Sequence, residues 1–392
     1  METLNKTDGP TCRFSGIELK HTFADLGRQP LSNSYLHPSK LSHAEPHYPL
    51  YAWVSEDNFL VQLEQFETAD EIFSDYAYFS SFSDGWLRHA EAYTSLMVER
   101  FGLSAESFVM EVASNDGYLL QYFTQRGIPV LGVEPAANVA EVAIGKGVPS
   151  EVVFMGEASA KELMQRYPGA DILAANNVLA HVPDLNDFII GLRTCLAPDG
   201  VLTIEFPHLM KLIQETQFDT IYHEHFSYFS FYTVQRIFAH HGITLFDVEQ
   251  LPTHGGSLRI YGKHAASTAH PVTGRVQSLL DEEVAAGLTD MATYTNFNEK
   301  VKKLKRNALG FLLAAKEEGK SIAAYGAPAK GNTMLNYCGI RTDIIDYTVD
   351  RSPHKQGLFL PGTQIPIFGP DHVAQTKPDY LLILPWNIKD EV

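Results

Sequence analysis

Cysteine is scarce in this sequence. The three cysteines, Cys12, Cys195 and Cys338, lie far apart in the chain. So small and scattered a set argues against the disulfide framework of a small secreted protein, and reduced thiols are expected. The sequence also lacks any run of about eighteen apolar residues, and residues 1–13 contain no apolar core of a signal peptide. These absences predict a cytoplasmic protein with no membrane partner.

Basic residues are also in short supply. The chain has 30 Lys and Arg against 47 Asp and Glu, which gives a formal net charge of -17 and a sequence pI near 5.3. Binding to nucleic acid or to an anionic membrane requires a basic surface. The composition therefore argues against a nucleic-acid partner, and any phosphate site must be built locally.

The amount of apolar sequence is that of an ordinary globular protein. Of the 392 residues, 45% are hydrophobic and 20% are charged, a balance that excludes disordered and fibrous chains. At roughly 100 to 200 residues per domain, this length predicts two or three domains with cores of their own.

Short apolar runs alternate with helix-like segments in the middle of the chain. The strand-like runs are 108–113, 129–134, 151–154, 170–175 and 201–206, and the helix-like segments are 118–126, 136–146, 158–167 and 185–196. Strict alternation is typical of parallel βαβ units, so we expect an α/β fold with a doubly wound sheet. Asp184 is a suitable N-cap for the last helix.

The regions on either side of this alternation follow other patterns. Residues 1–100 contain many prolines and short apolar pieces, which predicts a loop-rich small domain. Residues 217–232 interrupt the alternation with a polar and aromatic stretch, a setting in which functional residues are common. A polar helical run, 276–320, is expected to be a spacer with an amphipathic helix, and a second, smaller α/β unit follows it. The expected domains are residues 1–75, 76–267 and 268–392.

The first turn of the alternating region has the features of a nucleoside site. Residues 111–117, Glu-Val-Ala-Ser-Asn-Asp-Gly, end one strand and open a helix, so a ligand can approach the backbone closely. Ala113 and Asn115 stand where a dinucleotide fingerprint has glycines, which disfavours NAD. Glu134 closes the next strand, seventeen positions after Gly117, where an acidic residue accepts hydrogen bonds from ribose hydroxyls. A solvated carboxylate at a strand end is the alternative.

A polar segment follows the fourth strand. Residues 176–181 read Asn-Asn-Val-Leu-Ala-His, and their place at the carboxyl edge of the sheet favours contact with a ligand. Asn176, Asn177 and His181 have side chains that hold and orient polar groups. An Asn-rich turn followed by a surface histidine is the alternative.

The inserted stretch contains the most informative group, Tyr222-His223-Glu224-His225. Histidine takes up a proton near neutral pH, a neighbouring carboxylate can orient it, and a tyrosine hydroxyl donates to a developing oxyanion. This set suits proton abstraction from a carbon beside a carbonyl. A metal site is the rival interpretation, but zinc normally needs three or four converging ligands and the spacing is not that of a helical His pair.

Two further motifs lie near the end of the chain. His254 precedes Gly-Gly-Ser in a flexible segment that also reads as an ordinary turn. Residues 325–332, Tyr-Gly-Ala-Pro-Ala-Lys-Gly-Asn, follow a strand and precede a helix, which predicts a phosphate cradle of backbone amides with the ammonium of Lys330. The motif lacks the ending of a Walker loop, so ATP hydrolysis is not indicated. Arg351 and Lys355 either add positive charge for a diphosphate or are solvated surface.

With these motifs in order, the chain resembles the S-adenosylmethionine-dependent sugar C-methyltransferases of deoxysugar biosynthesis. The resemblance covers nearly the whole length and rests on residues 25–33, 76–81, 111–117, 132–135, 177–181, 222–226, 254–257 and 325–332. It implies a class I methyltransferase domain with a Rossmann-like fold, a small N-terminal domain and a smaller C-terminal Rossmann-like domain that binds a nucleotide-linked 4-keto-6-deoxy sugar.

The resemblance also implies roles for individual residues. His225 would be the base, supported by Tyr222, Glu224, Tyr76 and His181. The cofactor S-adenosylmethionine would be bound by Glu134 at its ribose, Met155 near its adenine, and Ala113, Asn115, Asn176 and Ser80. The sugar nucleotide would contact Asn177, His254, Tyr325, Lys330, Asn332 and Arg351.

The sequence departs from this family at one place. Relatives carry four cysteine ligands of a zinc ion in the N-terminal domain, in two Cys-x-x-Cys pairs. Here the pairs read Cys12-Arg-Phe-Ser15 and Ser55-Glu-Asp-Asn58. Because three of the four thiolates are missing, we expect no structural zinc and no other metal.

The expected reaction is methyl transfer to C3 of the sugar, after His225 removes the hydrogen beside the 4-keto group. Methylation at C5 or at oxygen remains an alternative, as does a non-catalytic protein that binds nucleotide sugars. The expected oligomeric state is a monomer or a weak dimer.

Overall fold

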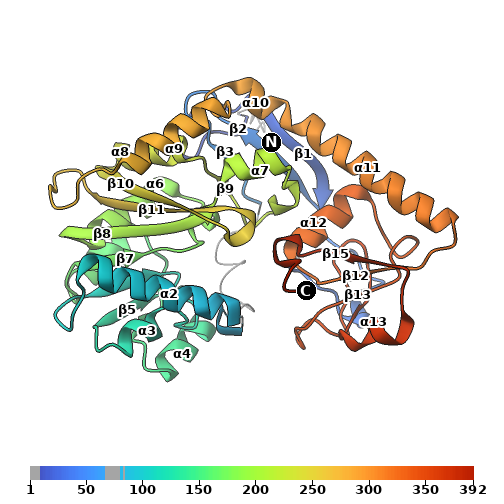
Figure 1. Cartoon of the computed structure of the whole chain (residues 1–392), viewed down its shortest axis with the longest axis horizontal. Coiled ribbons are helices and arrows are strands. Elements are labelled where there is room, and N and C mark those ends of the chain that lie inside the picture. The colour runs from blue at the N-terminus through green and yellow to red at the C-terminus, as the bar shows by residue number, and fades with distance from the viewer. Residues whose placement is uncertain (1–8, 67–79, 83) are drawn as a thin grey trace, which may run out of the picture.

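The computed structural model describes residues 9–66, 80–82 and 84–392 and contains three sheets within them (Figure 1). Their strand orders are β1-β2-β3-β9, β10-β11-β8-β7-β4-β5-β6 and β14-β13-β12-β15. The α/β fold class expected from the sequence is confirmed. In the described part of the chain, no helix is both long and apolar enough to cross a membrane.

The seven-stranded sheet forms the centre of the molecule. Its parallel strands are β4 (Val109–Val112), β5 (Val130–Val133), β6 (Ser150–Glu151), β7 (Ala170–Ala174) and β8 (Leu196–Pro207), and β10 (Ile243–Leu251) and β11 (Ser257–His264) pair antiparallel beyond β8. The helices between them are α3 (Leu120–Thr124), α4 (Ala137–Gly145), α5 (Glu157–Leu163) and α6 (Leu185–Cys195). All five strands and all four helices fall within the predicted segments or overlap them. Asp184 caps α6, as expected, by accepting from the Asp187 amide at 3.0 Å.

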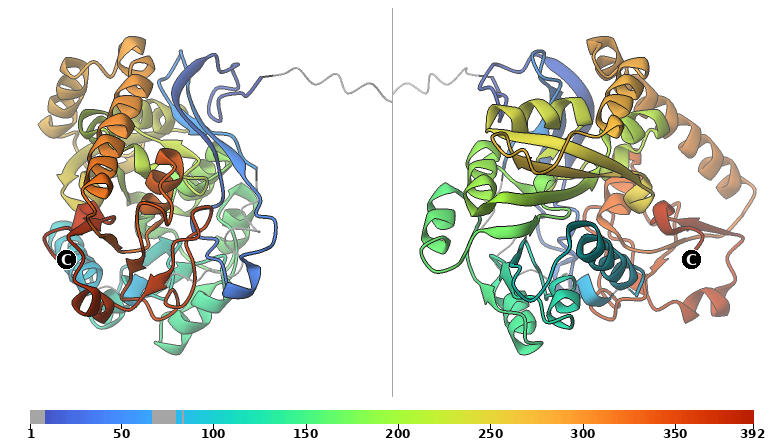
Figure 2. Two further views of the ribbon diagram at one scale, coloured as in Figure 1. Left: turned by 90° about the vertical axis from the view of Figure 1, so that its right-hand side faces the viewer. Right: turned by 60° about the vertical axis from the view of Figure 1, so that its left-hand side comes forward.

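Helices cover both faces of this sheet. One face packs against α2 (Asp84–Phe101), α3 and Ala143 of α4, and the other packs against α5, α6, α8 (Phe231–His240) and α9 (Gly274–Ala285). Successive residues of β4 point to opposite faces, so that Val109 joins one core and Met110 the other. Because both faces are buried, the strands read as continuous apolar runs. Figure 2 shows α2 lying along one face of the sheet.

The N-terminal region is more regular than its prolines suggest. Its strands are β1 (His21–Gln29), β2 (Tyr48–Val54) and β3 (Val61–Leu63), and they form an antiparallel sheet. The region is loop-rich between these strands, as expected: most of the prolines lie there, while Pro49 pairs within β2. The fourth strand, β9 (Ser227–Tyr228), comes from the stretch that interrupts the α/β alternation. That stretch is therefore attached to the N-terminal sheet.

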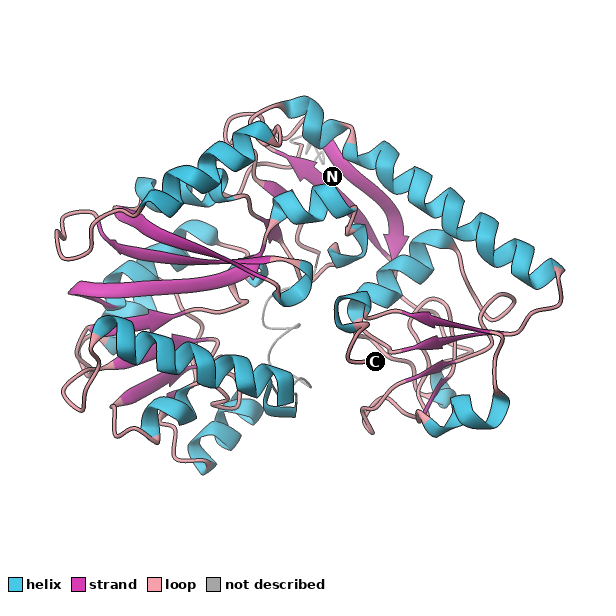
Figure 3. Cartoon of the chain, in the orientation of Figure 1, coloured by secondary structure: helices cyan, strands magenta, loops and turns pink. Residues whose placement is uncertain are grey.

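The segment expected to be a spacer is built into the fold. Helix α9 packs on β10, and α10 (Met291–Thr295) and α11 (Phe297–Glu317) pack on β1. Helix α11 then runs from the N-terminal sheet to the last domain (Figure 3). Phe297 and Val301 of α11 and Tyr294 of α10 share a core with β1, β2 and α7 (Leu209–Glu215).

The last sheet is parallel and small. Its strands are β12 (Ile322–Tyr325), β13 (Thr348–Val349), β14 (Ile367–Phe368) and β15 (Tyr380–Ile383), with helices α12 (Ala329–Cys338) and α13 (Asp371–Thr376). The strand predicted at 343–349 is shorter in the structure, because its first residues form a turn in which the amides of Ile344 and Ile345 donate to the Arg341 carbonyl. The core of this unit includes Tyr35 from the N-terminal region.

Candidate active site at the carboxyl edge of the central sheet

The turn between β4 and α3 has an unusual backbone. Ala113, Asn115 and Gly117 have φ values of 57°, 50° and 76°. Ala113 and Asn115, which stand where a dinucleotide fingerprint has glycines, thus adopt the left-handed conformation that glycine favours. At Gly117 an added Cβ would lie 3.2 Å from Ala143 Cβ and 3.1 Å from Val148 Cγ2, so this position needs glycine for close packing as well. The turn thus has the left-handed backbone that glycines usually provide, with glycine at only one of the three positions.

Glu134 lies against this turn. Its Oε2 accepts from the Asn115 amide at 2.9 Å, and its Oε1 accepts from the Ala136 amide at 3.0 Å. Ser80 joins the group, because its amide donates to Asn115 Oδ1 at 2.9 Å. Burial raises the pKa of Glu134, while the two amide hydrogen bonds oppose that shift. Each carboxylate oxygen still has a lone pair for a ligand hydroxyl.

The two consecutive asparagines follow β7. Asn177 has a φ of 55°, and its amide donates to the Glu205 carbonyl of β8 at 2.7 Å. Asn176 Oδ1 and Asn177 Nδ2 are buried and have no hydrogen-bond partner among the described residues. Buried polar atoms are normally paired, so these two are suited to a bound ligand. Met155, expected near an adenine, lies beyond β6 and packs on the edge of the main core.

These groups fit the cofactor that the family resemblance implies. The donor set combines a carboxylate at the end of β5 with a left-handed turn and with unpaired amide atoms after β7. A nucleoside such as S-adenosylmethionine offers ribose hydroxyls and an amino-acid tail to such a set. The structure brings Ala113, Asn115, Glu134 and Ser80 together, as expected from the sequence.

His225 is held in one tautomer by its neighbours. Its Nδ1 lies 3.1 Å from the Thr220 carbonyl oxygen, and its Nε2 lies 2.7 Å from the Tyr222 hydroxyl. A carbonyl only accepts, so Nδ1 carries the proton and Nε2 presents a lone pair to the Tyr222 O–H. Burial lowers the pKa of His225 well below its ordinary value. The imidazole is therefore neutral at pH 7, with Nε2 able to take a proton.

His181 and Glu224 complete this group. The two imidazoles of His181 and His225 meet edge to face with ring centres 4.7 Å apart. His181 Nδ1 donates to the Glu224 carbonyl at 2.8 Å, and burial lowers the pKa of His181 to about 4. The Glu224 carboxylate does not hydrogen-bond to His225 but accepts from Asn33 Nδ2 at 2.7 Å, so it anchors the N-terminal region. The group that orients His225 is the Thr220 carbonyl. His223 points elsewhere, with Nε2 3.2 Å from the Pro49 carbonyl oxygen.

In the motif predicted to cradle phosphate, two of the backbone amides already donate to acceptors of the protein. The Gly326 amide donates to the Val349 carbonyl at 2.6 Å, and the Ala327 amide donates to the Asp350 carboxylate at 2.8 Å. The remaining amides for an anion are those of the first turn of α12, which have no partner within the helix. Lys330 Nζ donates to Asn387 Oδ1 at 3.2 Å.

The other predicted substrate residues lie at different depths. Tyr325 is half-buried at the end of β12, and Asn332 is buried with its Nδ2 donating to the Ser32 carbonyl at 2.6 Å. His254 has a φ of 56° and lies 5.4 Å from the Trp86 ring. Arg351 is exposed, and the structure gives it no contact with the other predicted residues. Tyr76, the remaining predicted catalytic residue, lies outside the described residues.

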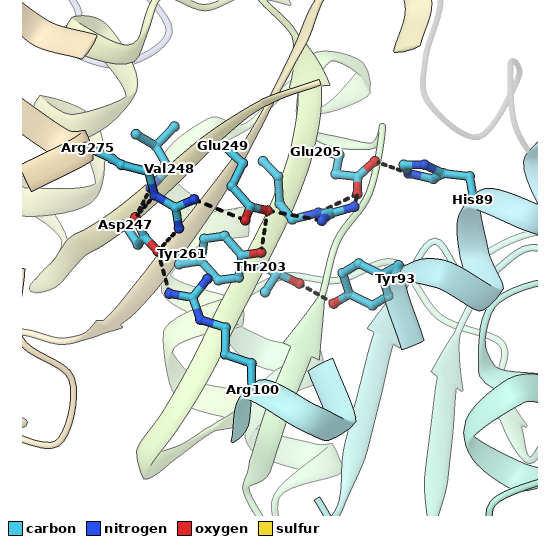
Figure 4. A network of polar contacts seen from close by, with 11 residues as sticks. His89, Tyr93, Arg100, Thr203, Glu205, Asp247, Val248, Glu249, Tyr261 and Arg275 are labelled. Carbon is cyan, nitrogen blue, oxygen red and sulfur yellow. Dashed lines mark hydrogen bonds and ion pairs between the residues drawn. The ribbon is translucent and has the colours of Figure 1, made fainter. Parts of the chain in front are cut away.

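Two residues that support the site had no local signal in the sequence. Thr220 acts through its carbonyl, and Asn33 reaches Glu224 across 191 positions. Beside the site, His89 Nε2 lies 2.8 Å from Glu205 Oε2 on β8. Figure 4 shows His89 and Glu205 at one end of a longer polar network. Asn33 falls within a motif that carries the family resemblance, which was the only hint of its place.

The positions at which the family resemblance implies zinc ligands lie together in the N-terminal domain. Asn58 Nδ2 donates to Cys12 Sγ at 3.4 Å and to Ser15 Oγ at 3.3 Å, and Ser55 Oγ donates to Asp57 Oδ1 at 2.5 Å. Over residues 9–66, 80–82 and 84–392, no group of three or more His, Cys, Asp or Glu side chains is arranged to hold a metal ion. The three cysteines of the chain are buried and form no disulfide bond.

Comparisons with known proteins agree with this architecture. Family models match residues 12–73 as "Putative zinc binding domain", 86–248 as "Methyltransferase domain" and 252–392 as "C-methyltransferase C-terminal domain". The chain is 34% identical over 381 residues to C-methyltransferase NovU of Streptomyces niveus, which covers 97% of this chain and 90% of NovU.

Solved structures of methyltransferases align with less than half of the chain. Magnesium protoporphyrin IX methyltransferase from Synechocystis, with bound SAH, aligns at 15% identity and a TM-score of 0.36, over 45% of this chain and 82% of that chain. An S-adenosylmethionine-dependent methyltransferase from Clostridium acetobutylicum aligns at 8% identity and a TM-score of 0.37, over 46% and 92%. The match to NovU over nearly the full length and the two methyltransferase models confirm the resemblance stated above: the chain belongs to the family of S-adenosylmethionine-dependent C-methyltransferases.

Proposed function

We propose that this enzyme methylates C3 of a nucleotide-linked 4-keto-6-deoxy sugar. The observation that carries the proposal is the setting of His225, whose Nδ1 donates to the Thr220 carbonyl and whose Nε2 accepts from Tyr222. A neutral imidazole with a fixed tautomer suits a reaction that begins by removing a proton from carbon. The likeness to a C-methyltransferase supports the same chemistry, because carbon has to become nucleophilic before it accepts a methyl group.

In the proposed mechanism the ketone acidifies the hydrogen on its neighbouring carbon. His225 Nε2 takes this proton, and the negative charge moves to the ketone oxygen as an enolate. Before this transfer the Tyr222 hydroxyl turns from Nε2 to the ketone oxygen, because Nε2 has a single lone pair, and there the tyrosine O–H stabilises the developing oxyanion. S-adenosylmethionine, when bound, supplies the electrophilic methyl group that the carbon accepts. The bond from C3 to hydrogen is broken and a bond from C3 to methyl replaces it.

The cofactor is proposed to lie against the turns after β4, β5 and β7. Glu134 would accept from the ribose hydroxyls, and Asn115 and Ser80 would hold the turn in place. Asn176 would use its unpaired Oδ1. Ala113 and Met155 would border the nucleoside.

The sugar nucleotide is proposed to lie between the domain of residues 76–267 and the domain of residues 268–392. Asn177 and His181 would contact the sugar, with His254 at its edge. Tyr325, Lys330, Asn332 and Arg351 are the proposed contacts of the nucleotide, with the first turn of α12 facing its phosphates.

The proposal is tested by the product and by a variant of His225. Incubation with S-adenosylmethionine and a 4-keto-6-deoxyhexose linked to thymidine, guanosine or cytidine diphosphate should yield a sugar with a new methyl group on C3, as located by NMR. His225→Asn should lower the turnover by about 10³-fold, because a positioned base contributes 10²- to 10⁴-fold. His43→Ala, at an exposed histidine, is the control for loss of an imidazole. Methyl on oxygen, or full turnover in His225→Asn, would contradict the proposal.

We also propose that the N-terminal domain folds without zinc. Cys12 is the only cysteine among residues 12–73, and Asn58 links it to Ser15 through hydrogen bonds. Asn58 Oδ1 also accepts from the Leu60 amide at 2.9 Å, which closes the turn after β2. These bonds would do what metal coordination does in relatives.

A further inference from the structure

We infer that Trp386 and Asp219 form a positioning pair that holds the base of the reaction from the C-terminal domain. The inference rests on the proposed role of His225. Trp386 begins a short turn after β15, Trp386–Ile388, and its Nε1–H donates to Asp219 Oδ2 at 2.6 Å. The two residues are 167 positions apart, and Asp219 is 5% exposed. A hydrogen bond between a buried carboxylate and an indole is a strong and directional contact.

Asp219 lies directly before the residue that orients His225. The turn Phe218–Thr220 contains both Asp219 and Thr220, and the Thr220 carbonyl accepts from His225 Nδ1 at 3.1 Å. The turn is closed by the Thr220 hydroxyl, which donates to the Gln217 carbonyl at 2.7 Å. A movement of Asp219 therefore moves the carbonyl that fixes the tautomer and direction of the imidazole.

The Trp386 ring also fits against a second turn, Thr253–Gly255, which lies between β10 and β11 of the central sheet. A Cβ added at Gly255 would lie 2.5 Å and 2.7 Å from two atoms of the indole, so only glycine permits this approach. The Gly255 carbonyl accepts from Gln217 Nε2 at 2.8 Å, which ties this turn to the one that contains Asp219. The indole thus fills a corner between the Phe218–Thr220 turn and the Thr253–Gly255 turn that includes His254.

Lys330 of α12 lies over the same ring. Its Nζ is 4.9 Å from the ring centre of Trp386 and donates to Asn387. Burial raises the pKa of Asp219 to about 6, while the Trp386 N–H and the positive charge of Lys330 favour the carboxylate. Asp219 is therefore charged at neutral pH. Among the described residues of the C-terminal domain, its charge faces the Trp386 N–H and the ammonium of Lys330.

This arrangement gives the C-terminal domain a part in proton abstraction. The domain contributes Trp386 and Lys330, and the methyltransferase domain contributes the turn that orients His225. Positioning effects of this kind are large, because a small misplacement of a reacting group costs up to about 100-fold in rate.

The test is the exchange of substrate hydrogen for solvent deuterium without S-adenosylmethionine. Wild-type protein is incubated in D₂O with a thymidine-diphosphate-linked 4-keto-6-deoxyglucose, and deuterium beside the ketone is followed by NMR. Trp386→Phe keeps a ring and removes the N–H, and the exchange rate should fall about 10- to 100-fold while KM for the sugar nucleotide changes less than about threefold. Trp53→Phe is the matched control, because the buried Trp53 Nε1 has no hydrogen-bond partner among the described residues; its exchange rate should equal that of the wild type.

Two variants of Asp219 test the hydrogen bond to Trp386 from the acceptor side. Asp219→Ala should lower the exchange rate as Trp386→Phe does, and Asp219→Asn, which keeps an acceptor oxygen, should restore most of it. A thermal shift with S-adenosylhomocysteine reports that each variant is folded, since a ligand of the native state raises its apparent stability. Wild-type exchange in folded Trp386→Phe and Asp219→Ala would overturn the inference.

The same assay separates this inference from the proposed function. If His225→Asn retains wild-type exchange, or if the wild type shows no exchange, the proposed function fails. If His225→Asn loses exchange and Trp386→Phe does not, the proposed function stands and only the positioning pair is overturned.

Discussion

Two buried polar regions of this protein differ in how completely their groups are paired. One is the network on β8, β10 and β11, in which Glu205, Asp247 and Glu249 are bound by arginines (Figure 4). Arg259 Nε lies 2.7 Å from Glu205, and Arg275 Nε lies 2.8 Å from Asp247, which Arg100 also contacts. Each carboxylate of this network has at least two partners.

The other region is the carboxyl edge of the central sheet. Here Asn176 Oδ1, Asn177 Nδ2 and Ser114 Oγ are buried and have no hydrogen-bond partner in the part of the chain that the structure describes. An unpaired buried polar atom lowers stability, whereas a paired one does not. The difference suggests two roles: the paired network stabilises the fold, and the unpaired atoms at the edge are available to the ligands of the proposed site.

The largest effect on stability is expected in the paired network. Asp247→Ala removes a buried carboxylate that Arg100 and Arg275 share, although Arg275 keeps Glu249, so the free energy of unfolding should fall by about 1.5 to 3 kcal/mol in urea titrations. The affinity for S-adenosylhomocysteine, measured by calorimetry, should stay within about twofold of wild type, because the network lies outside the proposed cofactor site. If Asp247→Ala lost affinity for S-adenosylhomocysteine and kept the wild-type free energy of unfolding, the network would serve binding and not stability.

The same carboxylate should give a pH dependence. Its hydrogen bonds from Arg275, Thr273 and Arg100 lower the pKa of Asp247 from 3.8 to about 2 despite its desolvation. A depressed folded-state pKa stabilises the protein above the unfolded-state value, so this contribution is complete above about pH 4 and is lost as the pH falls toward 2. Asp247→Asn should remove that part of the acid sensitivity, as seen by the difference in unfolding free energy between pH 5 and pH 3. An unchanged difference would show that Asp247 is not paired in solution.

At the carboxyl edge the expected effect is on binding. Glu134→Gln keeps the size of the side chain but removes the charge that two amides and the ribose would share. The affinity for S-adenosylhomocysteine should fall about 10-fold or more, because hydrogen bonds to a charged group contribute about 1.5 to 3 kcal/mol. Glu249→Gln, in the paired network, is the matched control and should bind as the wild type does. Equal affinities in both variants would remove Glu134 from the cofactor site.

A smaller change in stability is expected at Asn176. Because its Oδ1 has no partner among residues 9–66, 80–82 and 84–392, Asn176→Ala should alter the free energy of unfolding by less than about 1 kcal/mol. Binding of S-adenosylhomocysteine should still weaken measurably. A large loss of stability would mean that the atom is paired in the free protein.

The smallest effect is expected from removal of metal. Hydrogen bonds from Asn58 link Cys12 and Ser15 without a metal ion in the proposed domain. Treatment with a chelator should therefore change Tm by less than about 1 °C. Elemental analysis should find less than stoichiometric zinc. Bound zinc together with a large fall in Tm on chelation would contradict the proposed zinc-free domain.

Local patterns predicted the centre of the molecule well. The alternation of strands and helices and the N-cap Asp184 each depend on residues close in sequence, and the structure has both. The N-terminal sheet was missed because its fourth strand comes from residues 227–228, so its pairing crosses more than 160 positions. The same reason hid the contact of Asn33 with Glu224 and the contact of Trp386 with Asp219.

The orientation of His225 shows the limit of motif reasoning. The adjacent Glu224 suggested a carboxylate partner, but a backbone carbonyl has no signature in sequence, and it is Thr220 that accepts from the imidazole. Which neighbour a side chain meets in an irregular loop depends on the turn and on the elements packed around it.

The central claim is tested most directly by the distance from His225 to the carbon that loses its proton. In a crystal structure with S-adenosylhomocysteine and a nucleotide-linked 4-keto-6-deoxy sugar, Nε2 should lie about 3 to 3.5 Å from the carbon beside the ketone. An Nε2 more than about 6 Å from that carbon, with both ligands well ordered and another side chain in contact with it, would contradict the assignment of His225 as the base.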